Sequence, residues 1–365
     1  MTTDVSRVRF VVPADLEQRP TGGNHYDRAL ARALEDLGVA VELTPVAGTW
    51  PDASASAQDL LADRLLSRDP VLVDGLLACG SPGAMASAVA RGAAVHVLVH
   101  MPLGLDPGLG IGTAAGRDAR ERAALRSASS VLTTSAWAAA ELRRRHGVVA
   151  STVATPGVDP APLARGSTVP MLRQLATVSP VKDQLSVVAA LAGLRDLAWT
   201  AELTGALDVD PGYAAGVRSA IHDHGLGDRV RLTGPLTGAG LDRAWDATDL
   251  LLLASRAETW GMVVTEALSR GVPAVVSQGT GAVEALGRAP DGALPGALVP
   301  PGEPQELAAA IRRLLGRGRD AARRAALARR EMLPGWRQTA EVVRTALAPV
   351  DRAGSAHGVR GRASS

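Results

Sequence analysis

The chain has 365 residues, 46% of them hydrophobic and 21% charged, which is the composition of a soluble globular protein long enough for two domains. A net charge of +2 argues against a nucleic-acid-binding protein, and the single cysteine, Cys79, excludes an intrachain disulfide and any multi-cysteine metal site. No apolar run approaches the ~18 residues of a membrane span, and residues 1–9 lack the pattern of a signal peptide. We therefore expect a cytoplasmic protein.

Short apolar segments alternate with amphipathic helical segments along the first half of the chain. Strict alternation of this kind predicts βαβ units and a parallel, doubly wound sheet. We expect strands at 8–12, 39–43, 71–73, 95–99 and 131–133, and helices at 26–37, 60–66, 85–91, 118–127 and 136–146.

The pattern stops at the segment 155–162, which holds three prolines and a glycine, and it resumes after Pro170. We expect further strands at 172–178, 200–204, 230–232, 250–253 and 274–276, with helices dominating from 304 to 347. The predicted units are two α/β domains at 1–165 and 170–335, a helix at 336–349 and a disordered tail at 350–365. Two such domains place a ligand in the cleft between them, at the carboxyl ends of both sheets.

Lys182 is the only lysine among 39 lysines and arginines. It follows the predicted strand 172–178 and precedes a helix that begins near Asp183. A lysine at the carboxyl end of a strand and beside a helix N-terminus is well placed to meet a phosphate. Position alone leaves open that it is one lysine on a surface turn.

Two glutamates follow the strand 250–253, Glu258 in a turn and Glu266 on the helix that Gly261 opens. Their eight-residue spacing corresponds to about two helical turns, which brings both carboxylates toward one side. Such a pair suits the vicinal hydroxyls of a ribose and a sugar ring. Pairing of Glu258 with a helix dipole and a solvated position for Glu266 are the alternatives.

The two glutamates, Gly261 and the segment 266–276 resemble the nucleotide-sugar motif of the family 4 retaining glycosyltransferases. Further matches to this family occur in the same order along residues 8–347. They are Thr21-Gly22-Gly23 after the first strand, Thr155-Pro156-Gly157-Val158-Asp159 at the end of the first domain, Lys182, Gly279-Thr280-Gly281-Ala282-Val283-Glu284, and Leu298-Val299-Pro300-Pro301-Gly302. Six motifs in register carry far more weight than one.

The resemblance implies the GT-B fold, with two Rossmann-like domains around a central cleft, and a retaining, metal-independent hexosyltransferase. It implies that Lys182 neutralises the donor's diphosphate, that Glu266 holds the ribose and that Glu258 contacts the transferred sugar. Backbone groups of Thr280 and Gly281 would meet the sugar or the phosphates. Gly22 and Gly23 would let the first loop approach the diphosphate, because no Cβ intervenes. The helix at 336–347 would cross back to the first domain.

One departure from the family concerns the phosphate site. Many members carry an arginine shortly before the lysine, whereas this chain has Ser179, Pro180 and Val181 there. We expect Lys182 to carry more of the phosphate charge, or Arg256 to replace the missing arginine.

Three residues of the first domain are candidates for the acceptor side and for the chemistry. His100 ends the strand 95–99 and is expected to contact the sugar or to stabilise an oxocarbenium ion pair, with a structural role as the alternative. For His25 after the glycines and for Asp74 after the strand 71–73, an acceptor contact and a local structural role are equally favoured.

The expected function is transfer of a sugar from a nucleoside diphosphate sugar, UDP- or GDP-linked, to a small acceptor. A lipid acceptor contacted through Arg143–Arg145 at a membrane surface is less favoured. A nucleotide-sugar epimerase of the same fold and a non-catalytic nucleotide-sugar-binding protein are the alternatives. Asp208 and Asp210 are expected to cap a helix and not to bind metal, Gly108, Gly110 and Gly112 to form a loop, and Cys79 to be buried.

Overall fold

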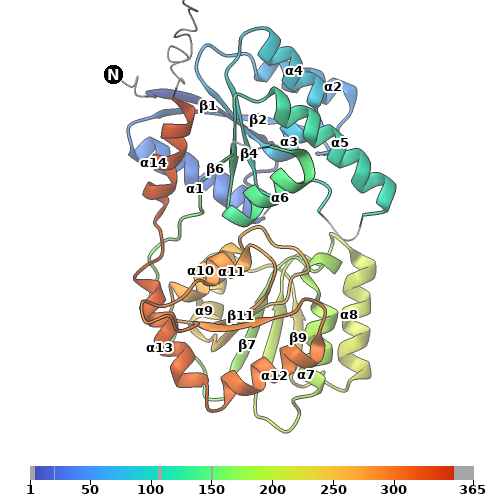
Figure 1. Ribbon diagram of the computed structural model, residues 1–365. Coiled ribbons are helices and arrows are strands. Elements are labelled where there is room, and N and C mark those ends of the chain that lie inside the picture. Colours follow the sequence, from blue (N-terminus) through green and yellow to red (C-terminus); the bar gives the residue numbers. More distant parts are fainter. Residues whose placement is uncertain (1–4, 20, 106–108, 149–150, 349–365) are drawn as a thin grey trace, which may run out of the picture.

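The computed structural model describes residues 5–19, 21–105, 109–148 and 151–348, so the predicted tail at 350–365 lies outside it. Two six-stranded sheets, parallel throughout, lie one above the other (Figure 1). The first domain contains β1 (Arg7–Pro13), α1 (Gly22–Asp36), β2 (Ala40–Val46), α2 (Ala55–Arg64), β3 (Val71–Asp74), α3 (Gly75–Gly80), α4 (Pro82–Ala90), β4 (Val95–Val99), α5 (Ile111–Ser127), β5 (Ser130–Thr133), α6 (Ala136–His146) and β6 (Ser151–Val153).

The second domain repeats this architecture and ends in three helices. Its elements are β7 (Met171–Leu175), the 3-10 helix η1 (Pro180–Lys182), α7 (Gln184–Ala192), β8 (Thr200–Thr204), α8 (Pro211–Asp223), β9 (Val230–Thr233), α9 (Gly238–Asp246), β10 (Leu250–Leu253), α10 (Met262–Leu268), β11 (Ala274–Ser277), α11 (Ala282–Leu286), β12 (Gly296–Val299), α12 (Pro304–Leu315), α13 (Arg319–Arg330) and α14 (Trp336–Leu347).

The strand orders are β2-β1-β3-β4-β5-β6 in the first sheet and β12-β11-β10-β7-β8-β9 in the second. The direction of winding therefore reverses between β1 and β3 in the first sheet and between β7 and β10 in the second. Loops that leave neighbouring strands at such a switch point diverge to opposite faces of the sheet and leave a crevice for a ligand. The predicted doubly wound α/β fold is confirmed.

Each sheet is covered by apolar helix faces on both sides. In the first domain α1 and α14 cover one face through Tyr26, Leu30, Trp336 and Val343, and α2 to α5 cover the other. In the second domain α7, α8 and α12 pack on one face, and α9, α10, α11 and α13 pack on the other. Alanine, leucine and valine fill these cores, as the 2% aromatic content requires.

The last helix, α14, returns to the first domain and packs against α1 (Figure 1). Where the two interdomain segments cross, the Val158 amide donates to the Pro334 carbonyl at 2.9 Å. A Cβ on Gly157 would lie 2.3 Å from the Trp336 nitrogen, so only glycine allows this crossing. The boundaries at residues 165 and 170 stay predictions.

Several predicted boundaries are wrong for identifiable reasons. The helix expected at 26–37 begins at Gly22, because the Thr21 side chain accepts a hydrogen bond from the Asn24 amide and caps it. The two glycines therefore form the first turn of a helix and not a loop. The strand expected at 39–43 runs on through Pro45 to Val46, because β2 is an edge strand and tolerates a missing backbone donor.

Candidate functional site

The switch point of the second sheet brings Lys182 and Glu258 together. Lys182 ends η1, which follows β7, and Glu258 lies in the turn that follows β10. The Lys182 Nζ is 2.6 Å from the Glu258 Oε2, and both side chains are partly exposed, 24% and 13% respectively. Two motifs that are 76 residues apart in the sequence thus form one charged pair at the carboxyl edge of the sheet.

Backbone contacts hold this pair in place. The Arg256 amide donates to the Val181 carbonyl at 2.8 Å and ties the turn after β10 to η1. The buried Gln174 side chain donates to the Lys182 carbonyl at 2.7 Å. Asp183 follows with a φ of 52°, a left-handed conformation that non-glycine residues rarely adopt. Such strain next to Lys182 persists only where the surrounding contacts enforce it.

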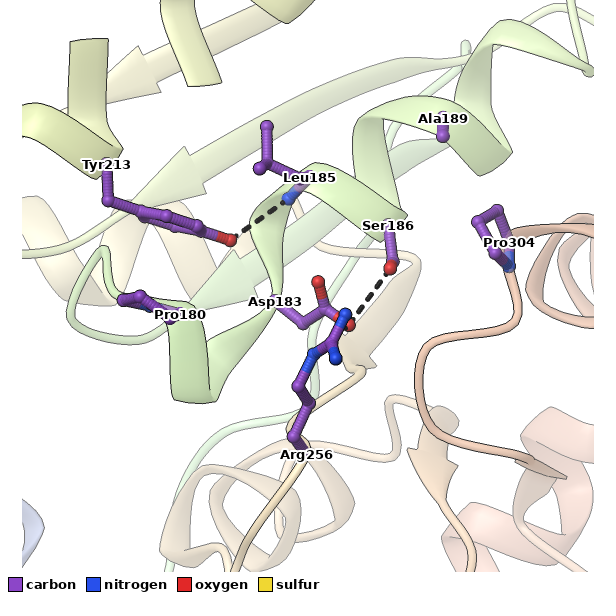
Figure 2. Close-up of a pocket in the computed structure, with 8 residues that line it drawn as sticks. All are labelled: Pro180, Asp183, Leu185, Ser186, Ala189, Tyr213, Arg256 and Pro304. Atoms are coloured by element: carbon purple, nitrogen blue, oxygen red, sulfur yellow. Dashed lines mark hydrogen bonds and ion pairs between the residues drawn. The ribbon is translucent and has the colours of Figure 1, made fainter. Parts of the chain in front are cut away.

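Arg256 lines a pocket of about 350 Å³ together with Asp183 and Tyr213 (Figure 2). Its Nε donates to the Asp183 Oδ2 at 3.0 Å, and its guanidinium, about half exposed, faces the wall formed by Ser186 and Pro304. The Tyr213 hydroxyl accepts from the Leu185 amide at 3.3 Å on the opposite side of the pocket. Arg256 is therefore paired with Asp183. That it supplies the missing phosphate arginine stays a prediction.

The turn that carries Glu258 is packed against the glycine segment before α11. The Gly281 amide donates to the Glu258 carbonyl at 2.7 Å, and a Cβ on Gly281 would lie 1.8 Å from the Thr259 carbonyl oxygen. Gly281 is therefore required for close packing, and its amide is already used. The Thr280 hydroxyl caps the same segment by donating to the Ser277 carbonyl at 2.9 Å.

The predicted helical spacing of Glu258 and Glu266 is wrong, because α10 begins only at Met262 and Glu258 precedes it. Gly261 precedes the helix with a φ of 82° and lets the chain turn sharply from Glu258 into α10. Glu266 lies on α10 and is partly buried. Burial raises the pKa of Glu266 to about 7, Arg270 opposes this rise and Asp159 adds to it. A carboxyl that is easily neutralised suits uncharged partners such as ribose hydroxyls.

The switch point of the first sheet assembles a second cluster. His100 follows β4 and its Nε2 lies 2.8 Å from the Asp27 Oδ1, on α1, and 3.8 Å from the Asp74 Oδ2, at the end of β3. Asp74 also caps α3, because its Oδ1 accepts from the Leu76 amide at 2.6 Å. The local structural role foreseen for Asp74 is thus present, and the same side chain also reaches His100.

The two glycines of α1 differ in their surroundings. A Cβ on Gly23 would lie 3.3 Å from the His100 ring, so this glycine lets α1 pack directly on the imidazole. A Cβ on Gly22 would meet no atom within 4 Å, so the space in front of Gly22 is open. His25 is exposed and its ring lies 6.1 Å from that of Trp336, beside the first turn of α14. The structure does not bring His25 into the His100 cluster.

Asp27 was not predicted as a site residue, although its position among the apolar residues of α1 indicates a buried carboxyl. It stands in the apolar stripe of α1 with Leu30, Ala31 and Leu34, and its side chain is completely buried. An ionisable residue within a buried helical stripe requires a polar partner in the core.

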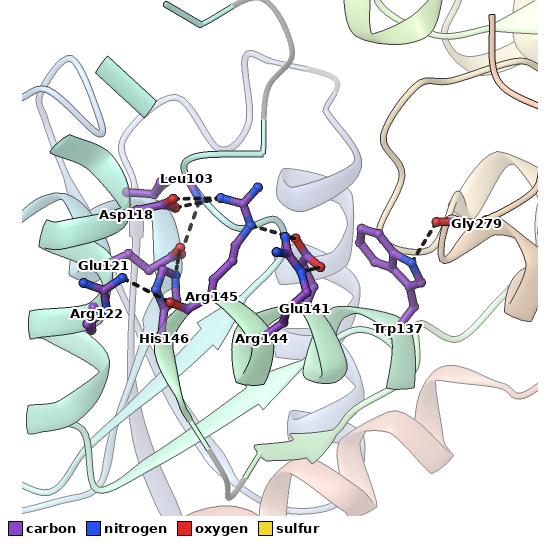
Figure 3. A network of polar contacts seen from close by, with 10 residues as sticks. All are labelled: Leu103, Asp118, Glu121, Arg122, Trp137, Glu141, Arg144, Arg145, His146 and Gly279. Atoms are coloured by element: carbon purple, nitrogen blue, oxygen red, sulfur yellow. Dashed lines mark hydrogen bonds and ion pairs between the residues drawn. The ribbon is translucent and has the colours of Figure 1, made fainter. Parts of the chain in front are cut away.

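The cluster of Asp27, Asp74 and His100 and a second one of Asp118, Glu121 and His146 each bring potential metal-ligating atoms within 4.8 Å of one another. The second cluster joins α5 and α6. His146 and Glu121 form a fully buried pair at 2.7 Å, and Arg145 binds Asp118 with two hydrogen bonds (Figure 3). Glu121 also accepts from the Leu103 amide at 3.3 Å, so this network supports the segment after His100.

The N-terminus of α6 contacts the second domain. The Glu284 carboxylate accepts from the amides of Ala136 at 3.0 Å and Trp137 at 2.5 Å. The Trp137 indole donates to the Gly279 carbonyl at 2.9 Å (Figure 3), and the Ser135 hydroxyl donates to the Thr259 carbonyl at 2.5 Å. We call these four hydrogen bonds the α6 clasp. They join the first domain to Thr259, which follows Glu258, and to Gly279 and Glu284, which lie on either side of Gly281.

Other sequence expectations concern residues outside these clusters. Asp210 caps α8 through the Tyr213 amide at 2.9 Å, as predicted. Cys79 is completely buried, as predicted, and burial raises the pKa of its thiol. Gly108 lies outside the described residues. Gly110 is the N-cap of α5 and Gly112 lies in its first turn, so the loop expected at Gly112 is wrong. Among Arg143–Arg145, Arg144 and Arg145 pair with Glu141 on the same helix. No helix in the part of the chain that the structure describes is long and apolar enough to cross a membrane.

Residues 159–331 match the family model described as "Glycosyl transferases group 1". A stretch of 105 residues, 29% of this chain, is 39% identical to a D-inositol 3-phosphate glycosyltransferase from Salinispora tropica. The match spans only 20% of the length of that relative.

The fold is shared with solved glycosyltransferase structures over nearly the whole chain. Sucrose-phosphate synthase from Thermosynechococcus elongatus superposes with a TM-score of 0.74 at 19% identity, over 93% of this chain and 98% of that one. Anabaena HepE in complex with UDP and glucose superposes with a TM-score of 0.72 at 20% identity, over 94% and 99%. The two stacked parallel-sheet domains are thus a GT-B fold, as the motifs predicted.

Proposed function

We propose that this chain, whose residues 159–331 match the family model of the group 1 glycosyltransferases, moves a sugar from a nucleoside diphosphate sugar to a hydroxyl of a small acceptor, with retention of configuration. The observation that carries the proposal is the Lys182–Glu258 pair, 2.6 Å apart, at the switch point of the second sheet. A cation and a carboxylate side by side at the edge where α/β sheets bind their ligands support a site for a diphosphate and for sugar hydroxyls.

In the ligand-free protein, Lys182 and Glu258 satisfy each other. An incoming diphosphate competes for the ammonium with two negative charges, and the released carboxylate becomes free to accept from sugar hydroxyls. Glu266 holds the ribose from α10. Lys182 supplies the positive charge that the departing diphosphate needs, so the site requires no metal.

In the transfer step the bond between the anomeric carbon and the diphosphate oxygen breaks, and a bond forms from that carbon to the acceptor oxygen on the same face. The acceptor's proton passes to the departing phosphate oxygen. Fixed donors around that oxygen lower the barrier because they act where negative charge develops.

Two relatives support the choice of donor and acceptor. HepE was crystallised with UDP and glucose, which favours a UDP-linked sugar. The Salinispora relative is named for a small polyol phosphate acceptor, which favours a small acceptor over a lipid. The composition favours a reaction in the cytoplasm.

The test is to incubate the protein with a panel of UDP- and GDP-sugars and a pool of small polyols and sugar phosphates, with EDTA present. We expect release of free nucleoside diphosphate, a product of retained anomeric configuration by proton NMR, and no loss of rate on metal removal. Lys182→Ala and Glu266→Ala should abolish release, whereas Arg68→Ala, an exposed arginine away from the two switch points, should not. Conversion of the donor without any acceptor would instead identify an epimerase.

A further inference from the structure

The buried carboxyl of Asp27 pairs with His100, which follows β4 at the carboxyl edge of the first sheet. Its side chain has no exposed surface, and its Oδ1 receives the His100 Nε2 at 2.8 Å. Its Oδ2 is buried and has no hydrogen-bond partner among the described residues. A carboxylate buried at this cost is retained where it pairs with a cation.

The His100 ring is fixed from several sides. Gly23 packs so closely against the ring that a Cβ at this position would lie 3.3 Å from the His100 Cδ2. The Tyr26 ring meets it edge-on at 5.1 Å, and Tyr26 itself is anchored because its hydroxyl donates to the Ala154 carbonyl at 2.8 Å. His100 remains 18% exposed, with Nε2 turned toward Asp27. No hydrogen bond joins Nδ1 to any of the described residues, which leaves this ring nitrogen for a ligand.

We propose that Asp27 is a positioning residue that fixes His100 with a proton on both ring nitrogens, so that Nδ1–H is a permanent hydrogen-bond donor toward the substrate and never a base. This inference rests on the proposed function only for the identity of the substrate. The arrangement of Asp27 and His100 stands on the geometry alone.

The charges around His100 agree with this role. Burial alone lowers the pKa of His100, but the charge and hydrogen bond of Asp27, with the charge of Asp74, outweigh burial and raise it to about 9. Burial and the neighbouring Asp27 raise the pKa of Asp74. Among the described residues, these are the two charged groups that act on His100, one from α1 and one from β3.

The chemical consequence concerns the acceptor's proton. An imidazolium cannot remove it, so the proton must leave with the diphosphate oxygen, as the front-face reaction requires. The Nδ1–H instead donates to an oxygen of the transferred sugar or of the phosphate, and its charge is offset by Asp27, which limits the cost of holding it in the cleft.

The decisive measurement is nitrogen-15 NMR of histidine-labelled, ligand-free protein at pH 7.5 in EDTA, with His100→Gln to assign the signals. We expect both His100 nitrogens to be protonated in the wild type and in Asp74→Asn, and one of them to lose its proton in Asp27→Asn. Asp36→Asn, an exposed carboxyl at the other end of α1, is the matched control. A neutral His100 in the wild type, or an unchanged imidazolium in Asp27→Asn, overturns the proposal.

Kinetics give a second, independent reading. Asp27→Asn and His100→Gln should each lower kcat roughly 10–100-fold with KM changed little, as expected for one charge-assisted hydrogen bond made mainly in the transition state. The double variant should be no slower than His100→Gln, since Asp27 acts through His100. Additive losses would mean that Asp27 is merely structural. If the wild type turns over no nucleotide sugar, the proposed function fails, while the NMR result still decides the role of Asp27.

Discussion

Lys182 and Glu258 occupy each other in the ligand-free protein, so neither charge is left buried and unpaired before the donor arrives. Only 24% of the Lys182 side chain and 13% of the Glu258 side chain are exposed, so a variant that removes one partner leaves the other charge largely buried and unpaired, which costs stability. Ligand effects in variants at these two residues are therefore measured against the same variant without ligand.

Glu266 should make the stability of the protein depend on pH. Its pKa in the folded protein is raised to about 7 by burial, so the folded state binds its proton more tightly than the unfolded state. This contribution to stability is complete below about pH 4.5 and is lost as the pH rises through 7. We expect Glu266→Gln to match the wild type near pH 5 and to exceed it near pH 8, by up to about 3 kcal/mol. Thermal unfolding across this range checks it, and a constant difference between the two proteins would contradict the burial of Glu266.

Gly281 is needed for packing, whereas Gly22 borders open space. A Cβ on Gly281 would overlap the Thr259 carbonyl, so Gly281→Ala must displace the turn that carries Glu258. We expect Gly281→Ala to lose about 2–4 kcal/mol, or several degrees in Tm. Gly22→Ala should unfold like the wild type, since nothing lies within 4 Å of its Cβ. Equal Tm values for the two variants would show that the 258–260 turn yields freely.

Single residues were predictable where a local pattern marks them. Lys182 and Glu258 stand out because each follows an apolar strand and shortly precedes a helix. Asp27 and Glu284 act through partners 73 and 147–148 residues away, and no local pattern reports such partners. The hydrogen bond from the Gly281 amide to the Glu258 carbonyl could not be predicted either, because it depends on how two loops pack together.

At the level of elements, the α6 clasp holds the two domains together through one helix N-terminus. Glu284 accepts from the first two amides of α6, which have no partner within the helix, and its charge complements the helix dipole. Trp137 binds the carbonyl of Gly279 on the segment that leads to Gly281. The contact between the two domains thus includes the turn that carries Glu258, since Ser135 donates to the Thr259 carbonyl.

Glu284→Ala should weaken the closed arrangement by about 1–2 kcal/mol, a roughly 5–30-fold shift toward open molecules. Small-angle X-ray scattering of the ligand-free variant should give a larger radius of gyration than the wild type. Glu306→Ala, which removes an exposed carboxylate from the first turn of α12, is the control and should not. An unchanged radius in Glu284→Ala would mean that the packing of α14 on α1 alone sets the domain arrangement.

The order and type of the elements followed from hydrophobic periodicity, because buried parallel strands and amphipathic helices have distinct patterns. Their ends did not. The start of α1 depends on a side-chain cap at Thr21, and the length of β2 depends on its place at the edge of the sheet. The sequence pattern of a strand does not state which strand lies at an edge.

At the scale of the whole molecule, each domain has one switch point, with Lys182 and Glu258 at that of the second sheet and His100 and Asp74 at that of the first. The resemblance to known glycosyltransferases predicted two parallel-sheet domains, and the strand orders confirm them. The crossing of the chain at Gly157 and the return of α14 keep the two domains in contact at one side.

The central claim is that Lys182 binds the diphosphate of a nucleotide sugar. Thermal unfolding with saturating UDP, GDP, ADP, CDP or dTDP tests it directly, since a ligand at 100 times its Kd adds about 2.7 kcal/mol to the state that binds it. We predict a rise in Tm of several degrees with one of these nucleotides, absent in Lys182→Ala and intact in Arg68→Ala. No shift with any of them, or an equal shift in Lys182→Ala, would contradict the assignment of this site.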